Sequence, residues 1–160
     1  IFDALIATRP EAQLSAAVWG IYERFDGCTT SQGLADYHQD SVAWTEQGIM
    51  DVLGPMMYWP EEEGACTDFR ALTEGFVADA APKKVWAGVH ALEIRANYTF
   101  DAAALNGRLA TALDVGAEGS VIFASTYFDQ DTTRWDALIG DETEPGAFFD
   151  DAAPPGAASR

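Results

Sequence analysis

Lysine is almost absent from this chain, which carries it only at Lys83 and Lys84. The 160 residues include 9 basic and 26 acidic side chains, so the formal net charge is −17. A field of that sign repels nucleic acid and anionic membrane surfaces, and both are poor candidates for partners. The acidic excess itself predicts solubility or adaptation to salt rather than a specific acidic site.

Two further features are lacking. No apolar stretch approaches the roughly 18 residues that a membrane span needs, so we expect no span. No hydrophobic segment is followed by a glycine-rich phosphate turn. This absence weighs against a doubly wound nucleotide-binding sheet, which is the alternative architecture, and no cofactor is implied.

What the sequence does contain is a hydrophobic segment that recurs four times. The segments cover 14–19, 50–56, 85–90 and 120–125, and they begin 36, 35 and 35 residues apart. A strand, a crossover helix and two loops take roughly 30 residues or more, so the spacing is typical of βα units. The segments are nearly continuous in apolar residues, as expected for parallel strands buried on both faces. Gly54 and Gly88 within them predict a close backbone approach or a bulge.

Helix signals fill the intervals. Asp40, Asp68 and Asp101 stand where an N-cap would begin helices over 41–46, 69–79 and 102–115, and Gly116 would end the last of these. Short helices are also expected over 1–8 and 134–139. Three tryptophans fall on helices or inside a strand and are predicted to lie in the core: Trp44, Trp86 and Trp135.

The fold class that this order predicts is α/β, with four consecutive βα units forming the C-terminal half of a (β/α)8 TIM barrel over residues 1–145. Residues 146–160, rich in Ala, Pro and Gly, are expected to form a linker or a disordered tail. A complete barrel takes about 250 residues. Four units leave two open strand edges that invite pairing. We therefore expect an N-terminal half-barrel that is absent from this sequence, or a second chain, to cover them; the start at Ile1, without an initiator Met, agrees with a piece of a longer protein.

Cysteine occurs only at Cys28 and Cys66. Each follows a predicted strand, so both belong to loops at the same rim, where neighbouring loops come within disulfide distance. We expect a disulfide, and hence a secreted or cell-surface protein; two free thiols are the alternative. No nearby His or Cys completes a tetrahedral set, so no metal site is expected.

Several stretches resemble a known family when they are taken in order. They are 14–20 (LSAAVWG), 37–44 (YHQDSVAW), 48–51 (GIMD), 55–58 (PMMY), 87–89 (AGV), 116–119 (GAEG) and 122–125 (IFAS). They look like the latter half of the glycosyl-hydrolase-like family 10 proteins, which are barrel proteins related to bacterial glycosidases. The resemblance covers roughly residues 1–140 and implies carbohydrate hydrolysis. The acidic DYxRY-like motif that ends an upstream strand in that family is missing, so this chain alone is expected to be inactive.

Barrels carry their chemistry at the C-terminal ends of the strands. Aromatic residues gather at or just past those ends, where their faces could stack on sugar rings. His90 ends the third segment, and Gln39 belongs to the family-like motif; either could bind a sugar hydroxyl. The predicted carbohydrate-binding residues are Trp19, Tyr22, Gln39, Tyr58, Trp59, His90 and Tyr127, with Phe128 at the same rim. Capping of the core is the alternative role for each aromatic residue.

Glycoside hydrolysis usually needs two carboxyl groups. Glu93 follows the third segment and Asp129 the fourth, so these are the catalytic candidates. Asp40 is explained by helix capping, and Asp51 precedes its strand and should lie at the opposite, stabilising end. We expect a glycoside hydrolase-like barrel segment that hydrolyses or binds a polysaccharide. The alternative is a non-catalytic barrel that binds glycans or another protein in a surface assembly.

Overall fold

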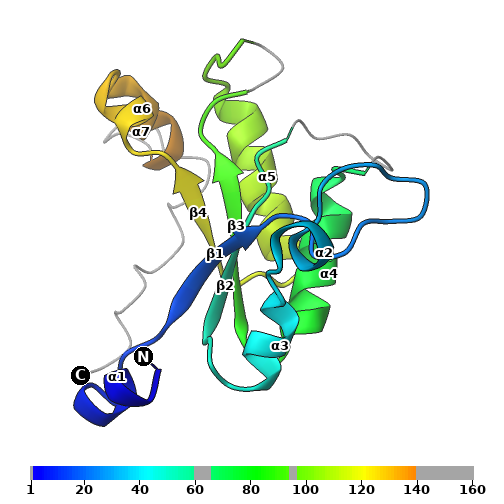
Figure 1. Cartoon of the computed structure of the whole chain (residues 1–160). Coiled ribbons are helices and arrows are strands. Elements are labelled where there is room, and N and C mark those ends of the chain that lie inside the picture. Colours follow the sequence, from blue (N-terminus) through cyan, green and yellow to red (C-terminus); the bar gives the residue numbers. More distant parts are fainter. Residues whose placement is uncertain (1, 60–65, 94–96, 140–160) are drawn as a thin grey trace.

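The computed structural model describes residues 2–59, 66–93 and 97–139. Its strands are β1 (Ser15–Trp19), β2 (Val52–Met56), β3 (Lys84–His90) and β4 (Gly119–Phe123). Its helices are α1 (Phe2–Thr8), α2 (Gly33–Tyr37), α3 (Ser41–Glu46), α4 (Phe69–Ala80), α5 (Ala102–Asp114), α6 (Thr126–Asp129) and α7 (Thr133–Ile139). The strands are parallel and lie side by side in chain order (Figure 1). The predicted α/β fold of consecutive βα units is confirmed.

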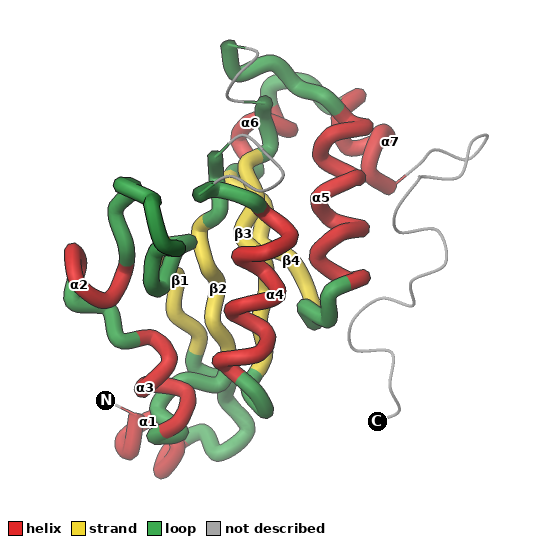
Figure 2. Tube along the Cα trace, turned by 90° about the vertical axis from the view of Figure 1, so that its right-hand side faces the viewer, coloured by secondary structure: helices red, strands yellow, loops and turns green. Residues whose placement is uncertain are grey.

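The core lies between the sheet and the helices α4 and α5, which cover one face (Figure 2). Alternate residues of a strand point to opposite faces. In β3, Ala87 and Val89 therefore point together into a buried cluster with Leu72 of α4 and Leu109 of α5. His90 follows Val89 in the strand, so its side chain points to the opposite face of the sheet.

The predicted helix caps are confirmed. The carboxylates of Asp40, Asp68 and Asp101 accept hydrogen bonds from the backbone N–H three residues later, at 3.2, 3.0 and 3.0 Å. Each bond satisfies one of the N–H groups that the first turn of a helix leaves unpaired. Gly116 follows α5 with a φ of 95°, a left-handed conformation that glycine adopts without strain. Helices α2 and α6 were not predicted.

At the N-terminal end of the sheet, Asp51 joins three strands. Its carboxylate accepts the backbone N–H of Leu14 at 3.0 Å and the Lys83 ammonium at 2.9 Å. Leu14 precedes β1, Asp51 precedes β2 and Lys83 precedes β3. The Leu14 hydrogen bond and then the Lys83 bond lower the pKa of the Asp51 carboxyl. Asp51 thus has a stabilising position away from the strand ends where barrels do chemistry, as expected.

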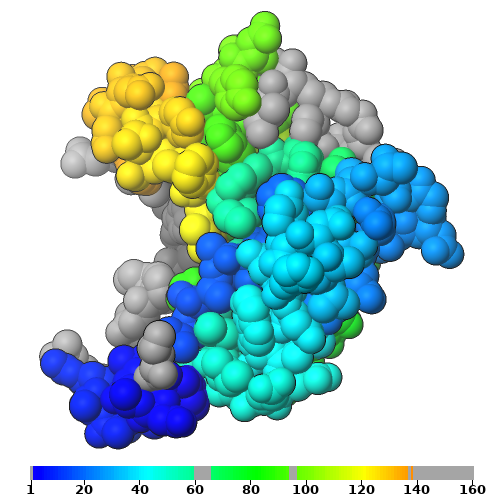
Figure 3. All heavy atoms as spheres, in the orientation of Figure 1, coloured from blue at the N-terminus to red at the C-terminus, as the bar shows by residue number. Residues whose placement is uncertain are grey.

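The second face of the sheet departs from the sequence prediction. Val121 and Phe123 of β4 are 44% and 48% exposed, so this strand is not buried on both faces. Trp86 projects from β3 and lines, with Met56 and Tyr58, an open cavity of about 180 Å³. The outline of the molecule is hollowed on this side, between α1 and α6 (Figure 3). The strands are apolar on this face because it corresponds to the interior of a barrel. The described residues leave that interior partly uncovered.

Four smaller expectations also have an outcome. Trp44 is partly buried against the core, but Trp135 is exposed on α7 and is not a core residue. A Cβ on Gly88 would lie 2.5 Å from the Pro55 carbonyl oxygen, so the predicted close approach is present there; at Gly54 the nearest atom is 3.5 Å away. None of the described helices is long and apolar enough to cross a membrane. The predicted tail over 146–160 lies outside the described residues.

Candidate functional site

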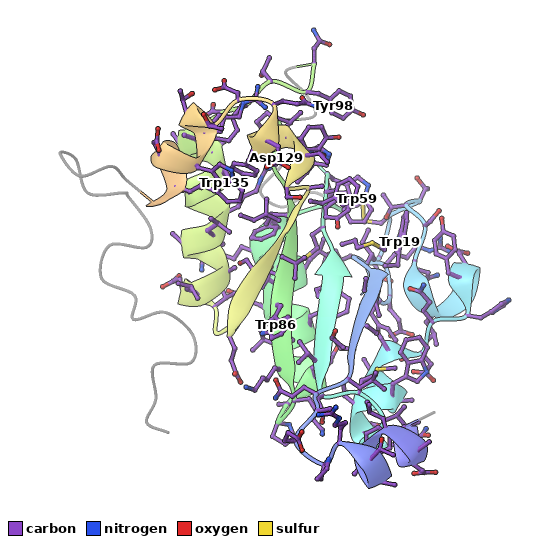
Figure 4. The ribbon with its side chains drawn as sticks, turned by 90° about the vertical axis from the view of Figure 1, so that its left-hand side faces the viewer. Trp19, Trp59, Trp86, Tyr98, Asp129 and Trp135 are labelled. Carbon is purple, nitrogen blue, oxygen red and sulfur yellow. A yellow bond between two sulfur atoms is a disulfide. The ribbon has the colours of Figure 1, made fainter. Side chains whose placement is uncertain are left out.

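The predicted rim residues lie at one end of the sheet. Trp19 and His90 end β1 and β3, and the segments that follow β2 and β4 bring Tyr58, Trp59 and Tyr127. In Figure 4, Trp19, Trp59, Tyr98 and Asp129 lie at this end, whereas Trp86 lies lower on the sheet. We call the aromatic edge the set formed by Trp19, Tyr37, Tyr58, Trp59, His90, Tyr98, Phe123 and Tyr127.

His90 occupies the centre of a ring of aromatic side chains. The centroid of its imidazole lies 5.4 Å from Tyr127, 5.7 Å from Phe123, and 5.9 Å from both Tyr58 and Tyr98. Tyr58 and Phe123 also stack on each other at 5.4 Å with an interplanar angle of 26°. The rings come from four different segments of the chain, so only the folded sheet brings them together.

The imidazole is fixed by residue 92. The backbone N–H of Leu92 donates to Nδ1 of His90 at 3.0 Å, and the Leu92 carbonyl oxygen lies at the same distance. An amide N–H can only donate and a carbonyl oxygen can only accept, so these two contacts hold Nδ1 in place with either tautomer of the ring. No hydrogen bond joins Nε2 to a residue in the described ranges. Leu92 thus orients the ring, and His90 itself is buried, with 6% of the residue exposed.

A second aromatic group lies at the end of β1. Trp19 contacts Tyr37 at 4.6 Å and Trp59 at 5.5 Å, measured between ring centroids. Its indole N–H donates to the Ser31 carbonyl oxygen at 2.7 Å. The backbone N–H of Trp19 donates to Oε1 of Gln39 at 2.8 Å. Hydrogen bonds therefore hold this tryptophan in place and leave its ring faces for packing.

Two predicted ligand-binding residues have other partners. The Gln39 side chain supports Trp19, as above. The Tyr22 hydroxyl donates to the Asp40 carboxylate at 2.8 Å, and burial followed by this hydrogen bond strongly raises the pKa of Tyr22. The Gln39 side chain thus links the end of β1, and the Tyr22 hydroxyl links the loop after β1, to the residues that precede α3. Sugar binding by either residue stays a prediction.

The two catalytic candidates differ in their surroundings. Glu93 forms an ion pair with Arg108 of α5, and the side chains are 21% and 6% exposed. The Glu93 backbone N–H also donates to the Thr99 carbonyl oxygen at 2.7 Å. Asp129 is exposed at the end of α6. Glu93 therefore has a structural partner that compensates a buried arginine, and Asp129 is the candidate open to solvent.

Residues 94–96 lie between Glu93 and Tyr98 and are outside the described residues. The hydrogen bond from the Glu93 N–H to the Thr99 carbonyl oxygen joins the two ends of the segment that carries Tyr98. Tyr98 itself is 58% exposed. The Glu93–Arg108 pair thus anchors the segment from which Tyr98 reaches the His90 ring.

The cysteines form the predicted disulfide. Cys28 and Cys66 are bonded with their Cα atoms 5.7 Å apart, which ties the loop after β1 to the segment before α4. Within the described ranges no group of three or more His, Cys, Asp or Glu side chains could hold a metal ion.

Sequence reasoning missed three members of the aromatic edge: Tyr37, Tyr98 and Phe123. Phe123 was placed inside a strand expected to be buried on both faces. Tyr98 lies eight residues beyond the end of β3, and no local pattern marks it as part of a site. Tyr37 ends α2, a helix that was not predicted.

Comparisons with known proteins place the fold. No family model matches, so the resemblance to the glycosyl-hydrolase-like family 10 proteins is not confirmed, and no curated protein matches. The structure of bee venom hyaluronidase in complex with a hyaluronic acid tetramer is similar over 84% of this chain and 45% of that chain, at 19% identity and a TM-score of 0.52. A monoclinic crystal structure of bee venom hyaluronidase gives a TM-score of 0.40 at 20% identity, over 89% and 46% of the two chains. The chain therefore has the fold of part of a TIM barrel and spans less than half the length of bee venom hyaluronidase.

Proposed function

We propose that this chain is part of a carbohydrate-processing barrel protein and binds a glycan at the aromatic edge. The observation that carries the proposal is the convergence of partly exposed rings on His90 at the C-terminal ends of the strands, where barrels carry their active sites. Aromatic faces next to an oriented imidazole suit a sugar, which has apolar ring faces and polar hydroxyls. The likeness of the fold to a hyaluronidase agrees with this proposal.

Binding and hydrolysis are two candidate functions for this edge. Hydrolysis would use Asp129 as acid or base, with a second carboxylate at a suitable distance. Glu93 is a poor candidate for that second group because it compensates Arg108. This pairing favours the second candidate, a non-catalytic glycan-binding role for these residues. A catalytic partner would then come from further βα units pairing with the open edges of β1 and β4, on the same or another polypeptide.

The disulfide supports a proposal about location. Disulfides persist in oxidising compartments, and Cys28–Cys66 joins two loops at the proposed binding edge. We propose that the protein is secreted or displayed at a cell surface, where a polysaccharide ligand is accessible.

The test is a fluorescence titration of the folded chain with oligosaccharides, using the tryptophans of the aromatic edge as probes. Tyr98→Ala should weaken binding by about two- to tenfold, because a stacked aromatic ring contributes roughly 0.5–1.5 kcal/mol. Leu113→Ala, an exposed apolar residue on α5, is the matched control and should leave the affinity unchanged. Equal effects of the two substitutions, or no binding by any glycan, would refute the proposal.

Release of new reducing ends separates the two candidate functions. If the protein hydrolyses its glycan, Asp129→Asn should abolish release while binding persists. Binding without release, before and after the substitution, would leave the non-catalytic role.

A further inference from the structure

We infer that the aromatic edge binds its glycan as a chain of at least three sugar units, which lies across the ends of the strands from β1 to β4. This inference rests on the proposed function and specifies the size of the ligand and the direction in which it runs. It follows from the division of the aromatic edge into two groups of rings, one toward each side of the sheet.

Both groups contain well-exposed rings. The β1 group consists of Trp19, Tyr37 and Trp59, and the His90 group consists of His90 with the four rings around it. Tyr37 is 46% exposed in the β1 group, and Tyr98 is 58% exposed in the His90 group. Each group therefore offers an aromatic ring on which a sugar can stack.

The two groups lie apart along the aromatic edge. Trp19 ends β1 and Phe123 ends β4, and the strands are ordered β1-β2-β3-β4. Neighbouring strands are about 4.8 Å apart, so three steps separate β1 from β4 by about 14 Å. Figures 1 and 2 both show α2, which carries Tyr37, well apart from α6, which follows β4. One sugar ring therefore cannot stack on both groups.

A row of rings connects the two groups. Trp59 contacts Trp19 at 5.5 Å, and its neighbour in the chain, Tyr58, contacts His90 at 5.9 Å, measured between ring centroids. In Figure 4, Trp59 lies between Trp19 and Tyr98. A six-membered sugar ring is comparable in size to a tyrosine ring. At this spacing, at least three rings are needed to cover the distance from β1 to β4.

The β1 group is held in position by bonds within the chain. The Trp19 indole N–H donates to the Ser31 carbonyl oxygen, and the Trp19 backbone N–H donates to Oε1 of Gln39. The disulfide between Cys28 and Cys66 ties down the loop that leads to Ser31. Stacking on a group that is already ordered costs little conformational entropy, so the β1 group can contribute to the affinity for a long ligand.

The experiment measures how affinity depends on the length of the ligand. The whole chain is titrated with cello-oligosaccharides and chito-oligosaccharides, from the monosaccharide to the hexasaccharide, and with hyaluronic acid from the disaccharide to the hexasaccharide. The same titrations are made with Tyr37→Ala, Tyr37→Phe and Tyr98→Ala. Leu113→Ala, on α5, is the control and should leave the affinity unchanged at every length.

We expect the affinity to rise by about two- to tenfold once the ligand is long enough to reach Tyr37, because a second stacked ring then contributes. Tyr37→Ala should remove this gain and leave the affinity for the short ligands unchanged, which also shows that the variant is folded. Tyr37→Phe keeps the ring and should keep the gain. Tyr98→Ala should weaken binding at every length.

Two results would overturn the inference and leave the proposed function standing. The first is equal affinity for short and long ligands, with binding weakened in Tyr98→Ala. The second is a gain with length that persists in Tyr37→Ala, or that is lost in Tyr37→Phe. No binding in any of the three series would overturn the proposed function and, with it, the inference.

Discussion

Removing the Glu93 carboxylate should destabilise the fold before it affects any chemistry. Arg108 has only 6% of its side chain exposed, and Glu93 is its ion-pair partner. Breaking a buried pair by removing one member costs roughly 3–5 kcal/mol, because the remaining charge is left uncompensated. Glu93 is 21% exposed, so water reaches part of the pair. We therefore expect Glu93→Gln to lower the free energy of unfolding by about 2–3 kcal/mol.

A double-mutant cycle tests the origin of that loss. Arg108→Met alone should cost a similar amount, since it leaves the carboxylate without its guanidinium. The double variant Glu93→Gln/Arg108→Met replaces the pair by neutral groups and should cost about 1 kcal/mol, so the coupling energy is about 3–5 kcal/mol. Urea unfolding followed by tryptophan fluorescence measures all four proteins, and the slope against denaturant should stay constant.

The cycle also separates a structural role of Glu93 from a catalytic one. If the pair anchors the segment carrying Tyr98, glycan affinity should fall in both single variants and stay low in the double variant, which also lacks the pair. Additive costs, or a loss below about 0.5 kcal/mol in both single variants, would refute the anchoring role. A fully stable Glu93→Gln variant without turnover would instead identify Glu93 as the acid or base.

Two further predictions concern the sheet. Asp51→Asn should lower the free energy of unfolding by about 1 kcal/mol near pH 7. Folding lowers the pKa of the Asp51 carboxyl from 3.8, so the stability that this carboxylate contributes is present above pH 3.8 and is lost as the pH falls through the pKa of the folded state. The stabilities of the wild type and the variant should therefore converge in acid-unfolding measurements. A constant difference down to pH 2 would contradict this. Gly88→Ala should cost about 2–3 kcal/mol in urea unfolding, because its Cβ would lie 2.5 Å from the Pro55 carbonyl oxygen. Gly54→Ala is the control and should be nearly neutral, because the nearest atom to its Cβ is 3.5 Å away. Equal costs of the two substitutions would contradict the close approach at Gly88.

Local signals in the sequence were enough to predict much of the fold. The spacing of the hydrophobic segments located the strands to within two residues at each end. Asp40, Asp68 and Asp101 were recognised as caps because a cap bonds to the backbone only three residues away. The rim loops that carry Cys28 and Cys66 followed from the parallel order of the strands, which sets neighbouring loops side by side.

The parts that could not be predicted depend on contacts between distant segments. Glu93 was predicted to be an acid or base because nothing near it in the sequence identifies Arg108, which lies in the following helix α5, as its ion-pair partner. Tyr98 and Phe123 join His90 only after β3 and β4 have paired. Trp135 was assigned to the core from its helix alone, and its exposure is decided by what packs against α7. Sequence periodicity identifies elements, but it does not say which side chains converge from different elements.

The disulfide closes residues 28–66 into a covalent ring that contains α2, α3 and β2. By a chain-entropy estimate such a ring stabilises the fold by about 4 kcal/mol. It also means that a protease that cuts the chain once anywhere inside the ring leaves both pieces joined, so β1 and β3 stay on one molecule. A nicked protein would migrate as intact without reductant and as two fragments with it, and its aromatic edge could outlast the cut.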